Sequence, residues 1–405
     1  MERPASEAEL ARVVAGARKV KVAGAGHSFS DIACTDGVMV DLSRLDRVLA
    51  VEGELVTVEG GTGIRALASV LAHHGLALEN QGDVDRQTIA GAISTATHGT
   101  GGRFGSISSQ VVRVRSVTAA GDVVDVREGD DLLAARVGLG ALGVICTVTL
   151  RCVPAFTVRR IDQPRPLDDV LARFDEHVDA NDHFELFIFP YTRTALTLTS
   201  ERSDRKPRPA AAATTFMRHV VLENAALELG CRLGRRLPRA IARINRTLVS
   251  ALSPAQHLDV SHRVYANRRT VRFTEMEYAI PREHTAEALE RVLALVTRRR
   301  LPIGFPIEVR VTAPDDALLS TAQGRPTGYI AVHQYRGMEF EAYFRAVEAI
   351  MDEYEGRPHW GKRHYQSAAT LRPRYPGWDR YLAVRERFDP ERKFANDYLR
   401  RVLGS

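Results

Sequence analysis

The spacing of apolar residues changes near Pro154, and no other feature of the sequence constrains the fold as much. Before it, short apolar runs alternate with helical patterns, as in the amphipathic stretch 5–18 followed by the strand-like run 19–23. After it, apolar residues recur at every second position over longer runs, as in HFELFIFPYT and PIEVRVTA. We therefore expect an α+β protein in which small α/β units precede a large, mostly antiparallel sheet covered on one face.

The length of the chain favours two domains, because 405 residues exceed what one hydrophobic core usually organises. We place the first domain at residues 1–155 and the second at 156–364. The glycines, prolines and aromatic residues that follow Trp360 suggest that the chain then returns to the first domain, over residues 365–405. The RKPRPAAAATT stretch near residue 205 is expected to be an exposed loop.

Composition narrows the class of protein. Hydrophobic residues make up 44% and charged residues 26% of the chain, as in an ordinary soluble globular protein. The four cysteines lack a CxxC pairing, and no secretory leader or run of about 18 apolar residues is present, so we expect reduced, mostly buried thiols in a cytoplasmic protein.

Basic residues are concentrated in one part of the chain. Residues 201–300 hold 20 Arg and Lys against 10 Asp and Glu, but no module that reads nucleic acid accompanies them. This excess is typical of a solvated helical face. Contact with an anionic membrane surface or an acidic partner is the alternative, which would make the protein membrane-associated.

The segment VAGAGHSFS, residues 22–30, places a histidine where a glycine-rich phosphate loop would continue. Gly24 and Gly26 fit the first two glycines of the nicotinamide dinucleotide pattern, but Phe29 stands where the third is required. The nicotinamide interpretation is therefore weak. Either His27 is incidental, or it bonds to a bound ligand.

A second glycine-rich segment, residues 80–105, is too long for a simple turn. Its glycines permit close approach of the backbone to a ligand, and its hydroxyl groups can bond phosphate or ring carbonyls. These hydroxyls belong to Thr88, Ser94, Thr95, Thr97 and Thr100. By itself the segment is as consistent with an ordinary loop as with a ligand cradle.

Taken together, the motifs resemble those of the vanillyl-alcohol-oxidase type of FAD-linked oxidoreductase, in particular its aldonolactone oxidase group, which includes D-arabinono-1,4-lactone and L-gulono-1,4-lactone oxidases and is related to alditol oxidases. The matching stretches occur in order: GAGHS at 24–28, THGTG at 97–101, GALGVI at 140–145, EMEYAIPRE at 275–283, EVR at 308–310 and HWGK at 359–362. The resemblance implies a two-domain fold in which two small α/β subdomains bind FAD and a cap domain carries the large antiparallel sheet.

The resemblance also implies which residues hold FAD. These are Gly24, Ala25, Gly26, His27, Ser28, Gly82, Asp83, Thr88, Gly91, Ser94, Thr95, His98, Gly99 and Ile145. In this family the histidine of the first loop is commonly bonded covalently to the flavin, which identifies His27 as the tether. The alternative is a histidine that only forms hydrogen bonds within the loop. No metal is implied.

Three residues are the candidate catalytic groups. Glu308 and Arg310 lie two apart on a predicted strand and so share one face. Without a flavin they would more simply form a structural ion pair. Beside one, Glu308 can accept a hydrogen bond from the substrate hydroxyl and Arg310 can stabilise negative charge on oxygen. Lys362 is expected near the flavin, and His359 either lines the same pocket or packs.

Two neighbouring residues bear on the substrate and on the electron acceptor. Polyol oxidases of this family have an active-site serine where this chain has Asp83, so we favour an aldonolactone substrate and keep an alditol as the alternative. Gly82 leaves room for dioxygen, which favours an oxidase over a dehydrogenase, with dioxygen or another electron acceptor reoxidising the flavin.

A hypothesis of another class also stays open. A non-catalytic or redox-partner flavoprotein would use its basic region to dock an anionic membrane or an acidic protein.

Overall fold

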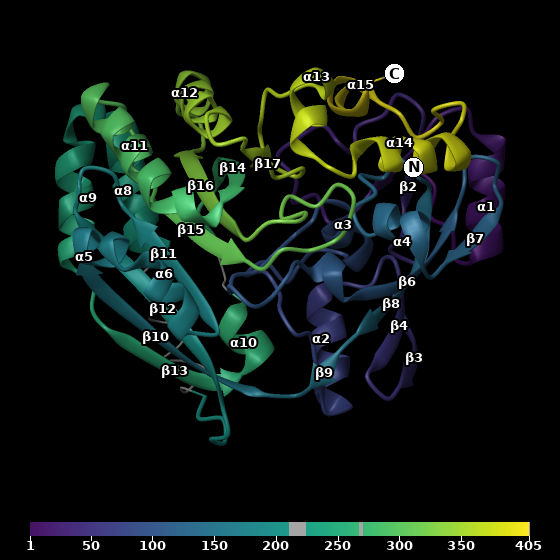
Figure 1. The fold of residues 1–405 in the computed structure, drawn as a ribbon, viewed down its shortest axis with the longest axis horizontal. Helices are drawn as coiled ribbons and strands as arrows, with labels where there is room; N and C mark the ends of the chain where they lie inside the picture. Colours follow the sequence, from purple (N-terminus) through teal and green to yellow (C-terminus); the bar gives the residue numbers. More distant parts are fainter. Residues whose placement is uncertain (210–223, 267–269, 405) are drawn as a thin grey trace.

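The structure, a computed structural model, describes residues 1–209, 224–266 and 270–404. It has two parts, with a large sheet and its helices at the left of Figure 1 and the N-terminal elements at the right. The α+β architecture predicted from the sequence is confirmed. Residues 204–209 of the expected loop are exposed, and its remainder lies outside the described residues.

The first part contains a short parallel pair and a five-stranded antiparallel sheet. Its helices are α1 (Glu7–Gly16), α2 (Ile64–His73), α3 (Ile89–Ser94) and α4 (Gly129–Ala135). The parallel pair is β1 (Val20–Ala23) with β2 (Val38–Asp41), and β5 (Leu76–Ala77) pairs with β9 (Val153–Pro154). The sheet has the order β3 (Val48–Glu52), β4 (Leu55–Glu59), β8 (Val144–Arg151), β6 (Val111–Val117), β7 (Val123–Val126).

The second part is built on an eight-stranded sheet in which all neighbouring strands are antiparallel. The order is β13 (Ala255–Val260), β10 (Thr157–Pro166), β12 (Thr194–Ser203), β11 (His183–Ile188), β15 (Ile307–Thr312), β16 (Thr327–Tyr335), β14 (Phe273–Pro281), β17 (Arg357–Pro358). The helices of this part are α5 (Leu167–Ala172), α6 (Phe174–Ala180), α8 (Asn224–Arg236), α9 (Ile241–Ser250), α10 (Ser261–Tyr265), α11 (Thr285–Arg298) and α12 (Glu341–Asp352).

Side-chain alternation gives this sheet an apolar face and a polar face. In β15, Ile307, Val309 and Val311 join the core formed with α5, α6, α11 and α12. Burying each such side chain stabilises the fold by about 1.5–3 kcal/mol. The intervening residues, Glu308 and Arg310, therefore point to the opposite face, where the sheet meets the first part of the molecule.

The C-terminal segment packs into the core of the first part. It contains α13 (Ala368–Leu371), α14 (Trp378–Phe388) and α15 (Asp397–Leu403), and its side chains share one cluster with α2, α3 and α4. Trp360 belongs to that cluster, and its indole N–H donates to the carbonyl of Leu319. In the described part of the chain, no helix is both long and apolar enough to cross a membrane.

Candidate functional site

A cleft of about 440 Å³ lies between the two glycine-rich segments. The first loop, the start of α3 and the stretch before β8 form its walls. Ten of the predicted cofactor residues line it: Gly24, Ala25, Gly26, His27, Ser28, Thr88, Gly91, Ser94, Thr95 and Ile145. The other four, Gly82, Asp83, His98 and Gly99, do not, and lie deeper toward the large sheet.

The first loop presents bare backbone to the cleft. Gly26 has φ +73°, a conformation that L side chains rarely adopt, and a Cβ on Gly24 would lie 3.1 Å from the Thr88 hydroxyl. Among the described residues, the N–H groups of Ala25, Gly26 and His27 donate no hydrogen bond. These free donors suit an anion such as the pyrophosphate of FAD.

The predicted hydroxyl groups divide into two sets. Thr88 caps α3 by accepting from the N–H of Gly91, and Thr88, Ser94 and Thr95 line the cleft. Thr97 and Thr100 do not line it. The Thr100 hydroxyl instead donates to the carbonyl of Phe184 and accepts from the N–H of Val311. It therefore joins the second loop to the large sheet, and both of these hydrogen bonds are made within the protein.

One cleft residue that the sequence analysis missed is Lys21, on β1. Its ammonium is buried and donates to the carbonyls of Gly140 and Phe394, both at 3.3 Å. Burial, reinforced by the guanidinium of Arg385, lowers the pKa of Lys21 to about 7. Lys21 therefore joins two segments at the cleft: the C-terminal segment, through Phe394, and the loop before β8, through Gly140.

The second loop docks directly on β15. The N–H of Gly101 donates to the carbonyl of Val311 at 2.8 Å, and the N–H of Ala313 donates to the carbonyl of Phe104 at 2.9 Å. This pairing brings Glu308 and Arg310 against the loop.

Arg310 is a buried cation surrounded by three carboxylates. Its guanidinium contacts Glu308, lies 3.3 Å from Asp83 (Nη2 to Oδ1) and donates from Nε to Glu185 at 3.0 Å. Burial opposes the charge, but the three acids together hold the pKa of Arg310 well above its usual value. Burial also raises the pKa of Glu185, in spite of the guanidinium beside it. Asp83 is thus engaged with Arg310 rather than projecting alone toward a substrate.

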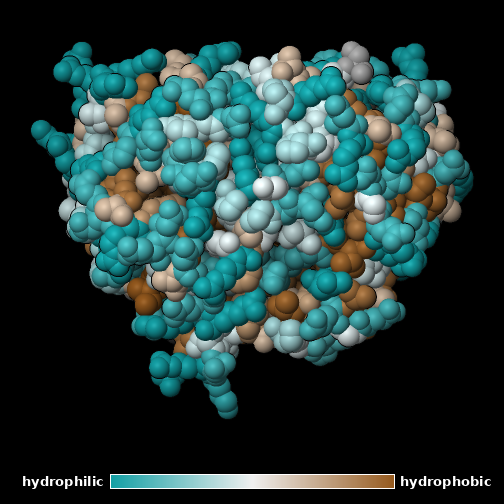
Figure 2. Space-filling view, viewed as in Figure 1, coloured by the Kyte–Doolittle hydropathy of each residue, from teal (hydrophilic) through white to brown (hydrophobic). Residues whose placement is uncertain are grey.

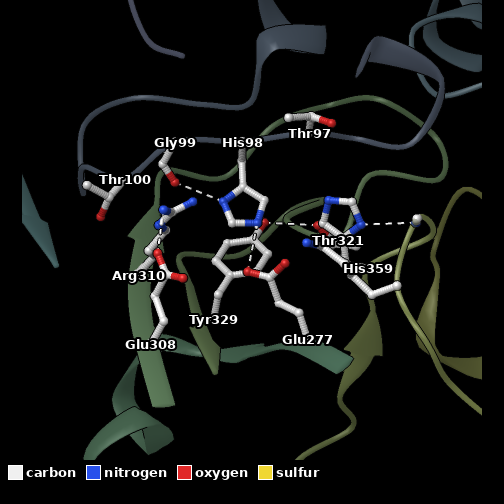
Figure 3. A network of polar contacts seen from close by, with 12 residues as sticks. Thr97, His98, Gly99, Thr100, Glu277, Glu308, Arg310, Thr321, Tyr329 and His359 are labelled. Atoms are coloured by element: carbon white, nitrogen blue, oxygen red, sulfur yellow. Dashed lines mark hydrogen bonds and ion pairs between the residues drawn. The ribbon is translucent and has the colours of Figure 1, made fainter. Parts of the chain in front are cut away.

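A second buried network surrounds Glu277 on β14 (Figure 3). His98 donates from Nδ1 to the carbonyl of Gly99, and its Nε2 lies 3.4 Å from Glu277 Oε1. The His98 ring stacks on Tyr329 with centroids 3.7 Å apart. Burial opposes ionisation of Glu277, but His98 outweighs it and lowers the pKa of this carboxyl to about 2.

The hydrogen bonds of His359 show why this network is not arranged as a metal site. Single ligand atoms of His98, Glu277 and His359 lie within 4.8 Å of one another, close enough to suggest one. However, His359 Nδ1 accepts from the N–H of Gly361, so the proton of the neutral ring is on Nε2. Burial lowers the pKa of His359 to about 4, which keeps that ring neutral. The three side chains are therefore arranged for hydrogen bonding and not around a metal ion.

Lys362 lies between the two parts of the molecule. Its ammonium contacts Glu275 on β14 and lies 5.3 Å from the centroid of the Phe29 ring. The N–H of Phe29 donates to the carbonyl of Gly361 at 2.7 Å, so the HWGK segment is joined to the loop that carries His27. Burial opposes the charge on Glu275, but Lys362 and then His333 hold the pKa of that carboxyl well below its usual value.

Sequence reasoning missed the three acids that support these cations. Glu185, Glu275 and Glu277 stand in apolar strands at alternate positions, on the polar face of the sheet. An acid inside a strand that is otherwise apolar was the available signal, because such a charge is buried only when it is paired.

Comparison with known proteins places these features in a family. Residues 148–402 match the family described as D-arabinono-1,4-lactone oxidase, and residues 2–127 match the FAD binding domain. The chain is 60% identical to L-gulono-1,4-lactone dehydrogenase of Mycobacterium tuberculosis, over 99% of this chain and 95% of that protein. It is 35% identical to L-gulonolactone oxidase of Mus musculus, over 99% of this chain and 94% of that protein.

A solved structure shows the same fold. Cholesterol oxidase from B. sterolicum superposes with a TM-score of 0.83 at 18% identity, over 99% of this chain and 93% of the other.

Proposed function

Because the chain belongs to the D-arabinono-1,4-lactone oxidase family, we propose that it oxidises a carbinol of an aldono-1,4-lactone, with L-gulono-1,4-lactone as the first candidate substrate. The observation that carries this proposal is the buried contact of Glu308 with Arg310, on the sheet face that meets the FAD-binding part. A base and a fixed cation on one face are what alcohol oxidation requires.

FAD, when bound, supplies the two-electron oxidising power by accepting a hydride from the carbinol carbon. Glu308 accepts the proton of the hydroxyl group, so that the C–O bond becomes a carbonyl. Arg310 stabilises the negative charge that grows on that oxygen. Asp83 and Glu185 keep the guanidinium group of Arg310 in one orientation, because Asp83 lies against its Nη2 and Glu185 accepts from its Nε.

Asp83 also supports a lactone over an alditol. Since its carboxylate lies against Arg310, it adds negative charge where polyol oxidases have a serine. To test the substrate, the purified holoenzyme is mixed with L-gulono-1,4-lactone, D-arabinono-1,4-lactone and a set of alditols, together with an artificial electron acceptor. Turnover on the lactones supports the proposal, whereas turnover on alditols alone contradicts it.

We further propose that His27 is bonded covalently to the flavin. Its side chain lines the cleft, and partial burial together with the Lys362 ammonium lowers the pKa of its imidazole. The neutral ring that results is the nucleophilic form. Acid-precipitated wild-type protein should therefore stay yellow, while His27→Ala should release its flavin. If the wild-type protein also released all of its flavin, the proposed covalent bond would be ruled out, but noncovalent binding of FAD would not.

For the electron acceptor we propose a compound other than dioxygen. The relative at 60% identity is named a dehydrogenase and the one at 35% an oxidase. The proposal rests on the name of the more similar relative, because Gly82 carries no side chain that would exclude oxygen; a Cβ there would lie 3.1 Å from the carbonyl oxygen of His98. Reoxidation of the reduced enzyme should then be faster with an artificial acceptor than with air-saturated buffer. Faster reoxidation by dioxygen would restore the oxidase interpretation.

A further inference from the structure

We propose that the helical hairpin of α8, the 3-10 turn Pro238–Ala240 and α9 docks the enzyme on an anionic membrane surface. This hairpin forms one edge of the cap domain, far from α1 in Figure 1. The inference concerns a surface separate from the cleft and from the residues assigned to the reaction.

Two leucines of α8, Leu229 and Leu233, are exposed although the helix also has a side that packs inward. The side that packs on α9 carries Gly230 and Gly234, whereas Cys231 and Leu227 pack against Val271 and Phe305. A Cβ on Gly234 would lie 2.9 Å from Ile241, so the two helices approach closely there. Larger apolar side chains would normally occupy that side and charged ones the outer side.

Leucines occupy the outer side instead. Leu229, Leu233 and Leu237 are four residues apart and are 59%, 42% and 60% exposed. In α8 this spacing places Leu229 and Leu233 in one row, and Leu237 follows directly after the last residue of the helix, Arg236. They make up three of the seven large apolar side chains that are exposed in the described residues. Figure 2 shows hydrophobic atoms among hydrophilic ones on the side of the molecule where α8 and α9 lie. An exposed apolar row of this kind marks a contact surface.

Arginines line two hollows, each of which includes part of the leucine row. The first hollow, of about 920 Å³, contains Leu229 and Leu233 together with Arg232, Arg235, Arg236, Arg272 and Arg336. The second, of about 580 Å³, contains Leu237 together with Arg236, Arg239, Arg243 and Arg246. Within the part of the chain that the structure describes, Arg236, Arg239, Arg243 and Arg246 form no ion pair. Residues 224–250 contain six arginines and a single acid, Glu228, which pairs with Arg232.

These features together favour a membrane over an acidic protein. Leucines flanked by arginines, four of which form no ion pair with the described residues, match a helix that lies in the headgroup region, with leucines inserted and guanidinium groups at the lipid phosphates. Protein interfaces are instead centred on aromatic anchors. The exposed large apolar side chains of this hairpin include no aromatic residue, and Tyr335, which lines the first hollow, is buried and already bonded to Glu228. A solvated face would need no leucines.

The test is flotation of the full-length holoenzyme with vesicles of phosphatidylcholine alone or mixed with phosphatidylglycerol. We expect binding only to the phosphatidylglycerol vesicles, and weaker binding as salt is raised. Replacing two arginines, Arg243→Gln with Arg246→Gln, should weaken that binding about thirtyfold, since each basic residue near such a surface contributes about fivefold. Leu233→Ser with Leu237→Ser should weaken it about tenfold, because apolar burial is lost.

Matched controls remove the same groups elsewhere. Arg12→Gln with Arg18→Gln deletes two exposed arginines at α1, and Leu49→Ser with Leu55→Ser deletes two leucines that are 49% and 39% exposed. All variants should retain flavin and lactone oxidation. Equal binding to both vesicle types, equal losses in hairpin and control variants, or binding to polyglutamate without binding to vesicles would each overturn the proposal.

Discussion

Three basic side chains of the site each lie against a buried carboxylate. Glu185 holds Arg310, Glu275 holds Lys362, and Glu277 faces His98. The charges in such pairs are already out of water, so removing one partner leaves an uncompensated charge in a medium of low polarity. We therefore expect the acids to be as sensitive to substitution as the cations.

Replacing Glu277 with glutamine should destabilise the protein at pH 7. The carboxyl has a pKa of about 2 when folded and 4.5 as its ordinary value, so its stabilising contribution is fully present above 4.5. A shift of this size corresponds to about 3 kcal/mol. As the pH falls below 4.5 toward 2, that contribution is lost. Urea unfolding of wild type and Glu277→Gln should therefore differ most at neutral pH.

The control for this prediction is Glu54→Gln, which changes an exposed acid. It should leave the urea midpoint nearly unchanged at every pH. A difference between Glu277→Gln and wild type that stays constant from pH 7 to pH 3 would show that the carboxyl is not ionised in the folded state.

The second glycine-rich loop connects the cleft proposed for FAD with the strand that carries Glu308 and Arg310. It lines the cleft at Thr95, and further on it pairs with β15 next to Glu308 and Arg310. Gly101 allows this close pairing because its φ is +128°, and a Cβ would lie 2.6 Å from the carbonyl of Asp182.

Gly101→Ala should therefore displace the loop from the sheet. We expect a fall in kcat/KM of about a hundredfold, the order expected when catalytic groups move by about 1 Å. Gly53→Ala is the matched control, because Gly53 also has a positive φ, +62°, but nothing lies within 4 Å of its Cβ position. The control should lose about 1 kcal/mol of stability and no activity. Similar kcat/KM values for the two variants would mean that the loop does not position the site.

Local sequence patterns predicted the helices and strands of this fold better than they predicted which distant residues contact one another. The period-two pattern placed Glu308 and Arg310 on one face, and the amphipathic stretch 5–18 contains α1. In contrast, the roles of Thr100 and Glu185 depend on strands that are distant in sequence. Thr100 bonds Phe184 and Val311, and no local spacing specifies those contacts.

For the whole molecule, the sequence indicated that the C-terminal segment returns to the first part. It did not indicate how deeply that segment is buried in the core there. The structure shows Trp360 and α13 to α15 within the core of that part, and the same segment carries His359 and Lys362 to β14. Residues from the first loop, the sheet and the C-terminal segment therefore meet at one place. The domain limits at 155 and 364 stay a prediction, as does the assignment of the individual site residues.

The central claim is that this meeting place oxidises a lactone with Glu308 as base. The direct measurement is the rate at which L-gulono-1,4-lactone bleaches the flavin absorbance without oxygen, for wild type, Glu308→Gln and the control Glu54→Gln. We predict fast bleaching in wild type and control, and a rate about 10² to 10⁴ times lower in Glu308→Gln with its flavin retained. The account would be contradicted if the lactone left the wild-type flavin oxidised, or if Glu308→Gln bleached as fast as the wild type.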